Sequence, residues 1–280
     1  MQDVIGIIGQ GPIGSHFAGK LIGEYDTIVY DLDRSLMEKA ISAGAKAADS
    51  LADMAAKANI VVLALPGDKA LRAVMDGENG LMAQMKDGQF IIDTGTSTAE
   101  LDRHYHVACR AQSLGFLEAP VSWREGGLLL MPAGDKAVFD RLETVIRCMS
   151  CKYCYIGEGG RGQELKSVNQ MLFSARIAIE AECVAYAQTL GFSEEIMEDF
   201  MGFGLNKRLY GDDFSRILGT SGLNYKDLLY TFQIAHEHGA FVPITQAVYE
   251  SFKYAVFNGA GNDDQSGIIA YWRQLNKGEK

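Results

Sequence analysis

Short apolar runs alternate with helical patterns over residues 3–157, and this alternation limits the possible folds more than any other feature. The runs expected to form strands are 4–8, 27–30, 60–65, 90–93, 116–119, 128–131 and 153–156. Several of them are continuous Val/Ile/Leu runs, as expected where helices cover both faces of a parallel sheet. The pattern therefore predicts an N-terminal doubly wound α/β domain.

The pattern changes after this region and becomes entirely helical. Residues 162–190 contain no proline and no internal glycine, and they predict one helix about 43 Å long at 1.5 Å per residue. The further helices expected are 193–203, about 223–238, 243–257 and about 265–275. Pro243 suits a first helical position, and Gly239 suits the preceding C-cap. We therefore expect residues 1–160 to form the α/β domain, and residues 161–280 to form an all-α domain that begins with a long connecting helix.

A glycine-rich segment directly follows the first expected strand and opens a helix. Its spacing, Gly9-x-Gly11-x-x-Gly14, is typical of the turn that holds the pyrophosphate of a dinucleotide in Rossmann-type domains. The helix N-terminus supplies N–H groups and a positive dipole end for the phosphates. The residues expected to bind cofactor here are Gly9, Gly11, Pro12, Ile13 and Gly14.

An aspartate at the end of the second strand indicates which dinucleotide is used. Asp31 lies roughly 20 residues past the glycines, where a carboxylate accepts hydrogen bonds from the adenosine ribose and repels a 2′-phosphate. NAD is therefore favoured, although Arg34 nearby keeps NADP possible. The alternative role for Asp31 is a helix N-cap. Leu65 and Pro66 end the third strand, at the sheet edge where nucleotides bind, and are also expected to contact the cofactor.

Charge and composition exclude several classes of partner. The net charge of −10 argues against a nucleic acid or an anionic membrane, because both require a basic face. The first residues show no secretory signal, and no apolar stretch reaches the roughly 18 residues of a membrane span. The five cysteines are an odd number, which is simplest to explain by reduced thiols in a cytoplasmic protein.

A cysteine cluster and two histidines raise the alternative of a metal site. Cys148, Cys151 and Cys154 have the spacing CxxCxxC, but no fourth ligand lies nearby in the sequence. Buried free thiols are therefore the favoured interpretation, and no bound metal is expected. A metal assay on the purified protein would distinguish free thiols from a metal site. His104 and His106 lie in a helical pattern without a carboxylate pair at ligand spacing, and surface or hydrogen-bonded histidines are favoured.

Further segments, together with the glycine loop, resemble the motifs of one enzyme family. They are IIDTGTST (91–98), EAPVSWREGG (118–127), GEGGRGQELKSVNQ (157–170), NYKDL (224–228) and GNDDQSG (261–267). On these motifs the chain resembles the β-hydroxyacid dehydrogenases, which include 3-hydroxyisobutyrate dehydrogenase, tartronate semialdehyde reductase and 6-phosphogluconate dehydrogenase-like proteins. The resemblance implies reversible oxidation of a short 3-hydroxy acid with hydride passing to the nicotinamide, and a homodimer or homotetramer. Gly95 departs from the family pattern, which usually has serine there.

Hydride transfer between an alcohol and a carbonyl requires a group that moves the hydroxyl proton, and Lys166 is the candidate. It follows the last glycine run, and Asn169 and Gln170 lie three and four residues later, on the same helical face. Burial lowers the pKa of a lysine, which would make the amine usable near neutral pH. Asn169 and Gln170 are expected to bind substrate oxygens or to orient the lysine. The alternative is a surface lysine on an exposed helix.

The resemblance also suggests which residues contact the substrate, and the sequence departs from the family pattern at one of these contacts. It implies that Thr96 contacts cofactor or substrate, and that Lys226 helps to bind anions. The family holds the substrate carboxylate with Ser-Gly-Gly, whereas this chain has Ser122, Trp123 and Arg124. We expect Arg124 to contact an anionic group and Trp123 to narrow the pocket. The alternative here is a remodelled surface loop.

The expected substrate is therefore a small anionic hydroxy acid or semialdehyde. Two other functions stay open at this stage. One is reduction of a different carbonyl or an imine with an anionic group held by Arg124. The other is a nucleotide-binding protein without catalysis, which Lys166 and Asn169 argue against.

Overall fold

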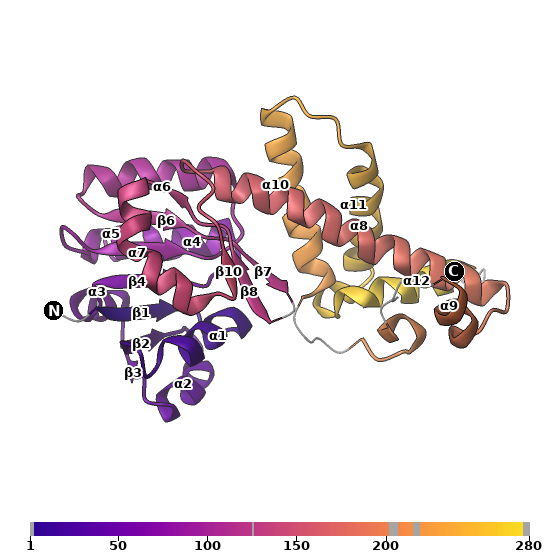
Figure 1. Ribbon diagram of the computed structural model, residues 1–280, viewed down its shortest axis with the longest axis horizontal. Coiled ribbons are helices and arrows are strands. Elements are labelled where there is room, and N and C mark those ends of the chain that lie inside the picture. Colours follow the sequence, from indigo (N-terminus) through magenta and orange to yellow (C-terminus); the bar gives the residue numbers. More distant parts are fainter. Residues whose placement is uncertain (1–2, 125, 202–206, 215–218, 277–280) are drawn as a thin grey trace. The chain divides into compact units, whose positions relative to one another are not determined.

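A computed structural model describes residues 3–124, 126–201, 207–214 and 219–276 (Figure 1). The chain divides into two compact units, Met1–Lys166 and Ser167–Lys280. Among the helices in these described ranges, none is both long and apolar enough to cross a membrane.

The first unit contains a seven-stranded sheet with the order β3-β2-β1-β4-β5-β6-β9. Its strands are β1 (Val4–Ile8), β2 (Asp26–Tyr30), β3 (Lys46–Ala47), β4 (Ile60–Leu63), β5 (Phe90–Asp93), β6 (Gly115–Glu118) and β9 (Ala133–Gly134). All pairs are parallel except β6–β9, and β1 lies between β2 and β4, with Ile7 opposite both Val29 and Val62. The strand order reverses between β1 and β4, so the Rossmann-type prediction is confirmed.

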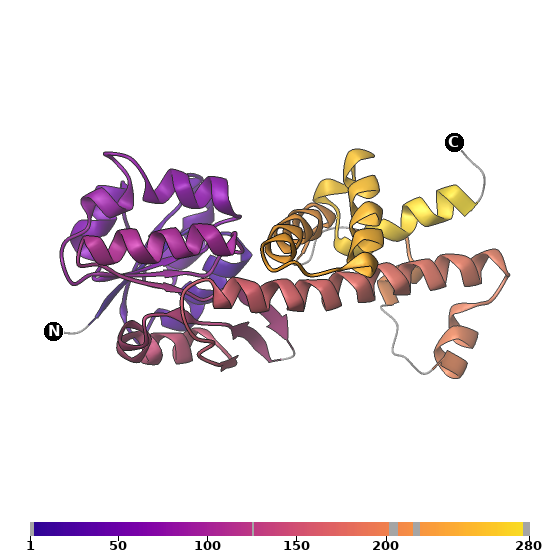
Figure 2. The same ribbon diagram turned by 90° about the horizontal axis from the view of Figure 1, so that it is seen from above.

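Helices cover both faces of this sheet (Figure 2). They are α1 (Pro12–Leu21), α2 (Glu38–Ser42), α3 (Leu51–Lys57), α4 (Asp68–Met75), α5 (Leu81–Gln84), α6 (Ala99–Ala111) and α7 (Lys136–Met149), with the 3-10 helix η1 (Arg34–Met37). Alternate residues of β4 enter opposite clusters, because successive side chains of a strand point to opposite faces. Ile60 and Val62 pack with α1 and α7, whereas Val61 and Leu63 pack with α3 to α6. This explains why the strand sequences are continuously apolar.

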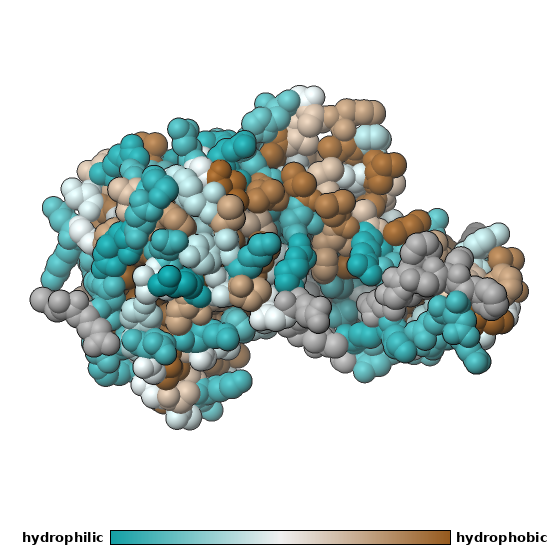
Figure 3. Space-filling model, in the orientation of Figure 1, coloured by the Kyte–Doolittle hydropathy of each residue, from teal (hydrophilic) through white to brown (hydrophobic). Residues whose placement is uncertain are grey.

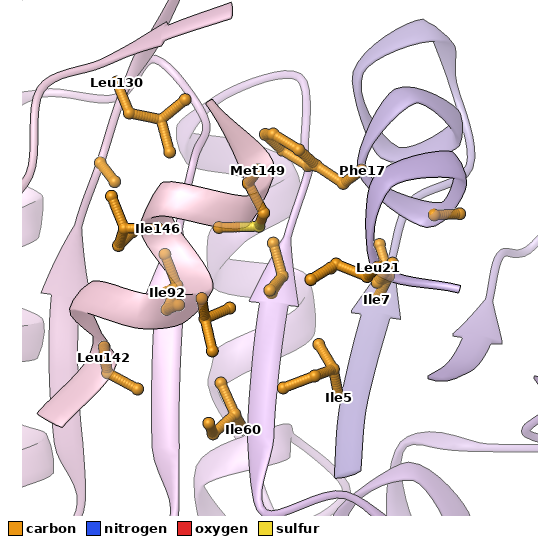
Figure 4. Packing of buried hydrophobic residues seen from close by; sticks show 14 of the residues in the cluster. Ile5, Ile7, Phe17, Leu21, Ile60, Ile92, Leu130, Leu142, Ile146 and Met149 are labelled. Atoms are coloured by element: carbon orange, nitrogen blue, oxygen red, sulfur yellow. The ribbon is translucent and has the colours of Figure 1, made fainter. Parts of the chain in front are cut away.

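The cluster below α1 and α7 consists of buried apolar side chains (Figure 4). Its members that Figure 4 labels are Ile5, Ile7, Phe17, Leu21, Ile60, Ile92, Leu130, Leu142, Ile146 and Met149, all at most 2% exposed. At about 25 cal/mol per Å² of apolar surface, each of these side chains stabilises the fold by about 1.5–3 kcal/mol.

Two of the expected strands do not belong to the main sheet. Runs 128–131 and 153–156 correspond to β8 (Gly127–Leu130) and the shorter β10 (Lys152–Tyr153), which form a second sheet with the order β10-β8-β7. The third member, β7 (Val121–Arg124), lies in a segment for which a loop was the alternative. It pairs antiparallel with β8, and Gly126 and the first residue of β8, Gly127, both have positive φ angles. Residues 121–124 therefore form a strand, and their role as substrate contacts stays a prediction.

The second unit is helical, as predicted, and contains all of the long, unbroken helix α8 (Arg161–Thr189) after Lys166 (Figure 2). Its other helices are α9 (Glu194–Met201), α10 (Ser221–Glu237), α11 (Pro243–Phe257) and α12 (Ile268–Asn276), with 3-10 helices η2 (Lys207–Tyr210), η3 (Ala260–Asn262) and η4 (Gln265–Gly267). The last two residues of the expected helix 193–203 lie outside the described residues. Val184, Leu228, Phe252 and Ile269 are fully buried in a core that belongs to this unit alone.

Candidate active site

The glycine loop between β1 and α1 has the geometry that a dinucleotide requires. Gly9 has φ +91°, and a Cβ at Gly14 would overlap the Gly9 carbonyl oxygen. A Cβ at Gly11, by contrast, would meet nothing within 4 Å. Gly11 is also the N-cap of α1 and makes no side-chain capping bond, with Pro12 at the first helical position. The buried Gln10 Oε1 atom has no hydrogen-bond partner. Open backbone at a helix N-terminus fits a pyrophosphate.

Asp31, which directly follows the neighbouring strand β2, forms a hydrogen bond with the glycine loop. Its Oδ2 accepts a hydrogen bond from the Gln10 N–H at 2.6 Å, and its Oδ1 accepts one from the Asp33 N–H at 2.9 Å. The alternative role as a helix N-cap is wrong, because Asp33 caps η1 by accepting from the Ser35 N–H. Arg34 is exposed and forms an ion pair with Asp49 at 2.8 Å.

The loop after β5 is mostly buried and is held by hydrogen bonds to the start of α4, and its one half-exposed residue is Thr96. Within residues 91–99 only Thr96 is half-exposed, and the rest are buried. Asp68 at the start of α4 accepts from both the N–H and the hydroxyl of Thr98, each at 3.0 Å. A Cβ at Gly95 would lie 2.9 Å from the Leu65 carbonyl oxygen, so this close approach explains the departure from serine. Leu65 is half-buried and Pro66 exposed at the adjoining end of β4.

The hairpin strand β7 turns its side chains alternately to opposite faces. Ser122 is buried, whereas Trp123 packs against the cluster under α1, with its ring 5.1 Å from that of His16 on α1. Burial lowers the pKa of His16 and so disfavours a charged ring next to the indole. Arg124 is exposed and donates from Nη1 to the Trp123 carbonyl oxygen at 3.3 Å. The substrate contacts expected of these three residues stay predictions.

Lys166 is buried, with only 6% of its surface exposed. Its Nζ donates to the Val121 carbonyl oxygen of β7 at 2.8 Å. A buried ammonium group requires such partners, because an uncompensated charge in a protein interior is costly. The alternative of a solvent-exposed lysine is therefore wrong, and the amine is fixed beside the hairpin.

Three predicted residues belong to the second unit. Asn169 and Gln170 follow Lys166 on α8, and Asn169 Nδ2 donates to Gln170 Oε1 at 3.2 Å. Gln170 Nε2 donates to Asp227 Oδ2 at 2.7 Å on α10, and Lys226 Nζ lies 3.0 Å from Asp227 Oδ1. Gln170 and Lys226 thus meet at one buried carboxylate. Their roles toward a substrate stay predictions.

The structure also reveals a buried polar group, at the first position of the EAPVSWREGG segment, to which the sequence assigned no role. Glu118, at the end of β6, is fully buried and accepts hydrogen bonds from backbone N–H groups at the start of α8. Asp102 on α6 is equally buried beside it. The one sequence signal is the glycine run before α8, because a Cβ at Gly162 would lie 2.8 Å from Glu118 Oε1.

The cysteine run is free but not buried, so that expectation is wrong. Cys148 is half-buried and donates to the Lys20 carbonyl oxygen, while Cys151 and Cys154 are exposed. The reason is that the run leaves α7 and follows β10, an edge strand of the small sheet. Within the described ranges, no three His, Cys, Asp or Glu side chains are grouped as a metal site requires.

Two family models match consecutive parts of the chain. Residues 4–157 match the NAD-binding domain of 6-phosphogluconate dehydrogenase, and residues 160–272 match the NAD-binding domain of NADP-dependent 3-hydroxyisobutyrate dehydrogenase. Together these matches cover both structural units.

Named relatives agree with the family models. The chain is 25% identical to 2-(hydroxymethyl)glutarate dehydrogenase of Eubacterium barkeri, over 97% of this chain and 95% of the relative. It is 24% identical to mitochondrial 3-hydroxyisobutyrate dehydrogenase of Rattus norvegicus, over 96% and 87% of the two chains. Among solved structures, 3-hydroxyisobutyrate dehydrogenase of Salmonella typhimurium has the same fold, with a TM-score of 0.85 at 24% identity over 96% and 99%.

The glycine loop, the doubly wound sheet and the long helix thus agree with matches that run along the whole chain. The chain belongs to the β-hydroxyacid dehydrogenase family of NAD(P)-dependent oxidoreductases that act on CH–OH groups.

Proposed function

We propose that this enzyme interconverts a small 3-hydroxy acid and its semialdehyde or keto form, that it uses NAD(H) in preference to NADP(H), and that Lys166 is its acid–base group. The buried, anchored amine of Lys166 carries the proposal. Asp31 supports the cofactor preference, because its carboxylate lies at the end of β2 and would repel a 2′-phosphate.

Lys166 serves the reaction by moving one proton. The nicotinamide, when bound, supplies the acceptor of the hydride. In the oxidative direction the neutral Lys166 amine takes the hydroxyl proton while the C–H bond breaks, and the carbonyl double bond forms. In the reverse direction the ammonium returns that proton to the oxygen. The hydrogen bond from Nζ to the Val121 carbonyl oxygen limits the positions open to the amine and orients it.

Replacing Lys166 with Met tests this assignment. We expect kcat to fall by about 10²–10⁴, the usual contribution of an acid–base group. The dissociation constant for NADH, measured by fluorescence titration, should change less than twofold. Lys39→Met, at an exposed position of α2, is the matched control and should turn over normally. Turnover retained by Lys166→Met would contradict the role.

We further propose that Arg124 contacts an anionic group of the substrate. Its exposed guanidinium at the end of β7 is suited to a carboxylate, sulfonate or phosphonate. Arg124→Ala should raise the KM for the substrate about ten- to hundredfold, because a hydrogen bond to a charged group contributes about 1.5–3 kcal/mol. The substrate is first identified by following NAD(H) absorbance with short hydroxy acids and semialdehydes. Arg147→Ala, exposed on α7, is the control, and an unchanged KM for Arg124→Ala would refute the contact.

The enzyme is also proposed to be a homodimer or homotetramer. Large apolar side chains lie exposed along α8, among them Leu172, Ile179 and Tyr186 at 73%, 54% and 61% exposure. On the face shown in Figure 3, hydrophobic side chains gather over α8, α10 and α11. A spacing of seven residues aligns the three side chains along one side of the helix. Apolar surface of this kind marks an interaction site, and a second copy is the partner we propose.

A further inference from the structure

Glu118 attaches the first turn of α8 to the end of strand β6. Its Oε2 accepts from the Gly160 N–H at 2.8 Å, and its Oε1 accepts from the Gly162 N–H at 2.6 Å and the Gln163 N–H at 3.4 Å. The first N–H groups of a helix have no partner within the helix, so a buried helix start needs an acceptor of this kind. The negative charge also interacts favourably with the positive end of the helix dipole.

A second buried carboxyl group, that of Asp102, lies beside Glu118. Burial raises its pKa well above the usual range, and the neighbouring Glu118 charge raises it further. Burial likewise raises the pKa of Glu118 to about 7, while the backbone N–H donors and the hydrogen bond from Asp102 lower it. Both burial and the neighbouring Glu118 charge therefore disfavour ionisation of Asp102.

Gln163 connects this carboxyl pair to the loop after β5. Its Nε2 donates to Asp102 Oδ2 at 2.9 Å and to the Gly95 carbonyl oxygen at 3.0 Å, and its Oε1 accepts from the Ser97 N–H at 3.3 Å. The two residues that it contacts in this loop flank Thr96. The loop and the start of α8 are therefore held at a fixed separation.

The same stretch of chain contacts α8 a second time, one helical turn later. Glu118 binds the N–H groups of Gly162 and Gln163, and three residues beyond Glu118 the Val121 carbonyl oxygen accepts from Lys166 Nζ at 2.8 Å. Two attachments, at the start of the helix and at its lysine, prevent α8 from sliding or rotating along residues 118–121.

We propose that Glu118 is a positioning residue that sets the place of the Lys166 amine. The inference rests on the proposed role of Lys166. Glu118 itself is turned entirely toward protein donors and is fully buried, so it does not touch the substrate.

Other charged groups surround the pair and enter any pH dependence. His106 Nε2, on α6, lies 3.5 Å from Glu118 Oε2, and burial lowers the pKa of this histidine to about 4, so that it is neutral. Arg103 on α6 forms an ion pair with Glu164 on α8 at 3.3 Å. Lys166 is the cation on the same helix. Burial raises the pKa of Glu118 to about 7, so its carboxyl group titrates near neutral pH.

The test compares Glu118→Gln and Glu118→Ala with Glu158→Gln, an exposed glutamate two residues before Gly160. Two quantities are measured: amide hydrogen exchange of Gly160, Gly162 and Gln163, and kcat beside the dissociation constant for NADH. In Glu118→Ala we expect exchange to quicken at least tenfold and kcat to fall at least tenfold, with NADH binding within twofold. Glu118→Gln should lie between, because its amide oxygen can keep the Gly162 and Gln163 contacts. Its pH profile of kcat should shift, because an ionisable group close to the start of α8 is removed, while the control matches the wild type.

The outcomes separate this inference from the proposed function. If exchange quickens in Glu118→Ala but kcat stays unchanged while Lys166→Met is inactive, the positioning role is overturned and the function of Lys166 stands. If Lys166→Met retains turnover, the proposed function fails instead, whatever the exchange rates show. If the alanine variant does not fold, Glu118→Gln decides alone: an unchanged kcat and pH profile would overturn the inference.

Discussion

At the scale of single residues, the glycines of the loop after β1 have separable roles. Gly14 allows α1 to contact the Gly9 carbonyl oxygen, whereas Gly19 on the same helix is exposed and a Cβ there would meet nothing within 4 Å. Gly14→Ala should displace the loop, raising the dissociation constant for NADH at least tenfold and costing about 1–3 kcal/mol through overpacking. Fluorescence titration and thermal unfolding measure both effects.

Gly19→Ala is the matched control for this substitution, because it adds the same methyl group to the same helix. It should bind NADH normally and raise Tm by about 2–4 °C, since alanine is favoured over glycine in a helix by about 1 kcal/mol. If Gly14→Ala bound NADH as tightly as the wild type, the expected overlap between the added methyl group and the Gly9 carbonyl oxygen would not affect the loop.

The predictability of individual residues depends on how far along the chain their partners lie. The glycine loop and Asp31 form one βαβ unit, so their approach could be predicted from spacing. Glu118 accepts hydrogen bonds from backbone N–H groups that lie 42 to 45 residues later in the chain. Asp102 accepts a hydrogen bond from the Gln163 side chain, 61 residues later. No local periodicity encodes such pairs. The glycine run before α8 marked the close approach, but it did not indicate which side chain fills the space.

At the scale of elements, long periodic segments were predictable and short pairings were not. Residues 243–257 and 90–93 match α11 and β5 at both ends, because proline and apolar runs mark them locally. Strand β7 was missed although Val121 and Trp123 alternate with Ser122. Its stability comes from pairing with β8 and from packing of the indole on α1, and both are tertiary contacts. The element that presents the proposed substrate contacts was therefore the least predictable.

The start of α8 should make stability depend on pH in a way that one substitution exposes. Glu118 has a native pKa of about 7, above its ordinary 4.5, so its contribution is complete below pH 4.5 and is lost as the pH rises to 7. His106 has a native pKa of about 4, below its ordinary 6.5, so its contribution grows as the pH rises between these values. In the wild type the two trends oppose each other.

Glu118→Gln removes one of the two trends. Its free energy of unfolding should rise with pH between 5 and 6.5 more steeply than that of the wild type, by up to about 1.4 kcal/mol per pH unit, the value for one proton. Urea unfolding at several pH values gives this slope. In Glu158→Gln the free energy of unfolding should change with pH as it does in the wild type. The same result for Glu118→Gln would mean that Glu118 titrates as an ordinary carboxyl group.

At the scale of the whole molecule, each unit has its own core, and the apolar pattern of the sequence becomes helical close to the start of α8. Unit 1 buries two clusters, one on each face of the sheet, while unit 2 buries a separate helical cluster. What the chain pattern did not indicate is how much apolar surface α8 leaves exposed. Its apolar residues occur around much of the helix, so periodicity alone did not distinguish the core side from the exposed side.

That exposed side leads to a prediction about assembly. If α8 pairs with a second copy, a charge in the row of Leu172, Ile179 and Tyr186 has to be desolvated at the interface, and an unpaired buried charge costs several kcal/mol. Leu172→Glu together with Ile179→Glu should therefore shift the protein from dimer or tetramer to monomer in sedimentation velocity at micromolar concentration. Val107→Glu, an equally exposed apolar position on α6 at 72%, adds the same charge outside α8 and should leave the sedimentation coefficient unchanged. The assembly through α8 would be contradicted by a monomeric wild type. It would also be contradicted by a double variant with the same sedimentation coefficient as an oligomeric wild type.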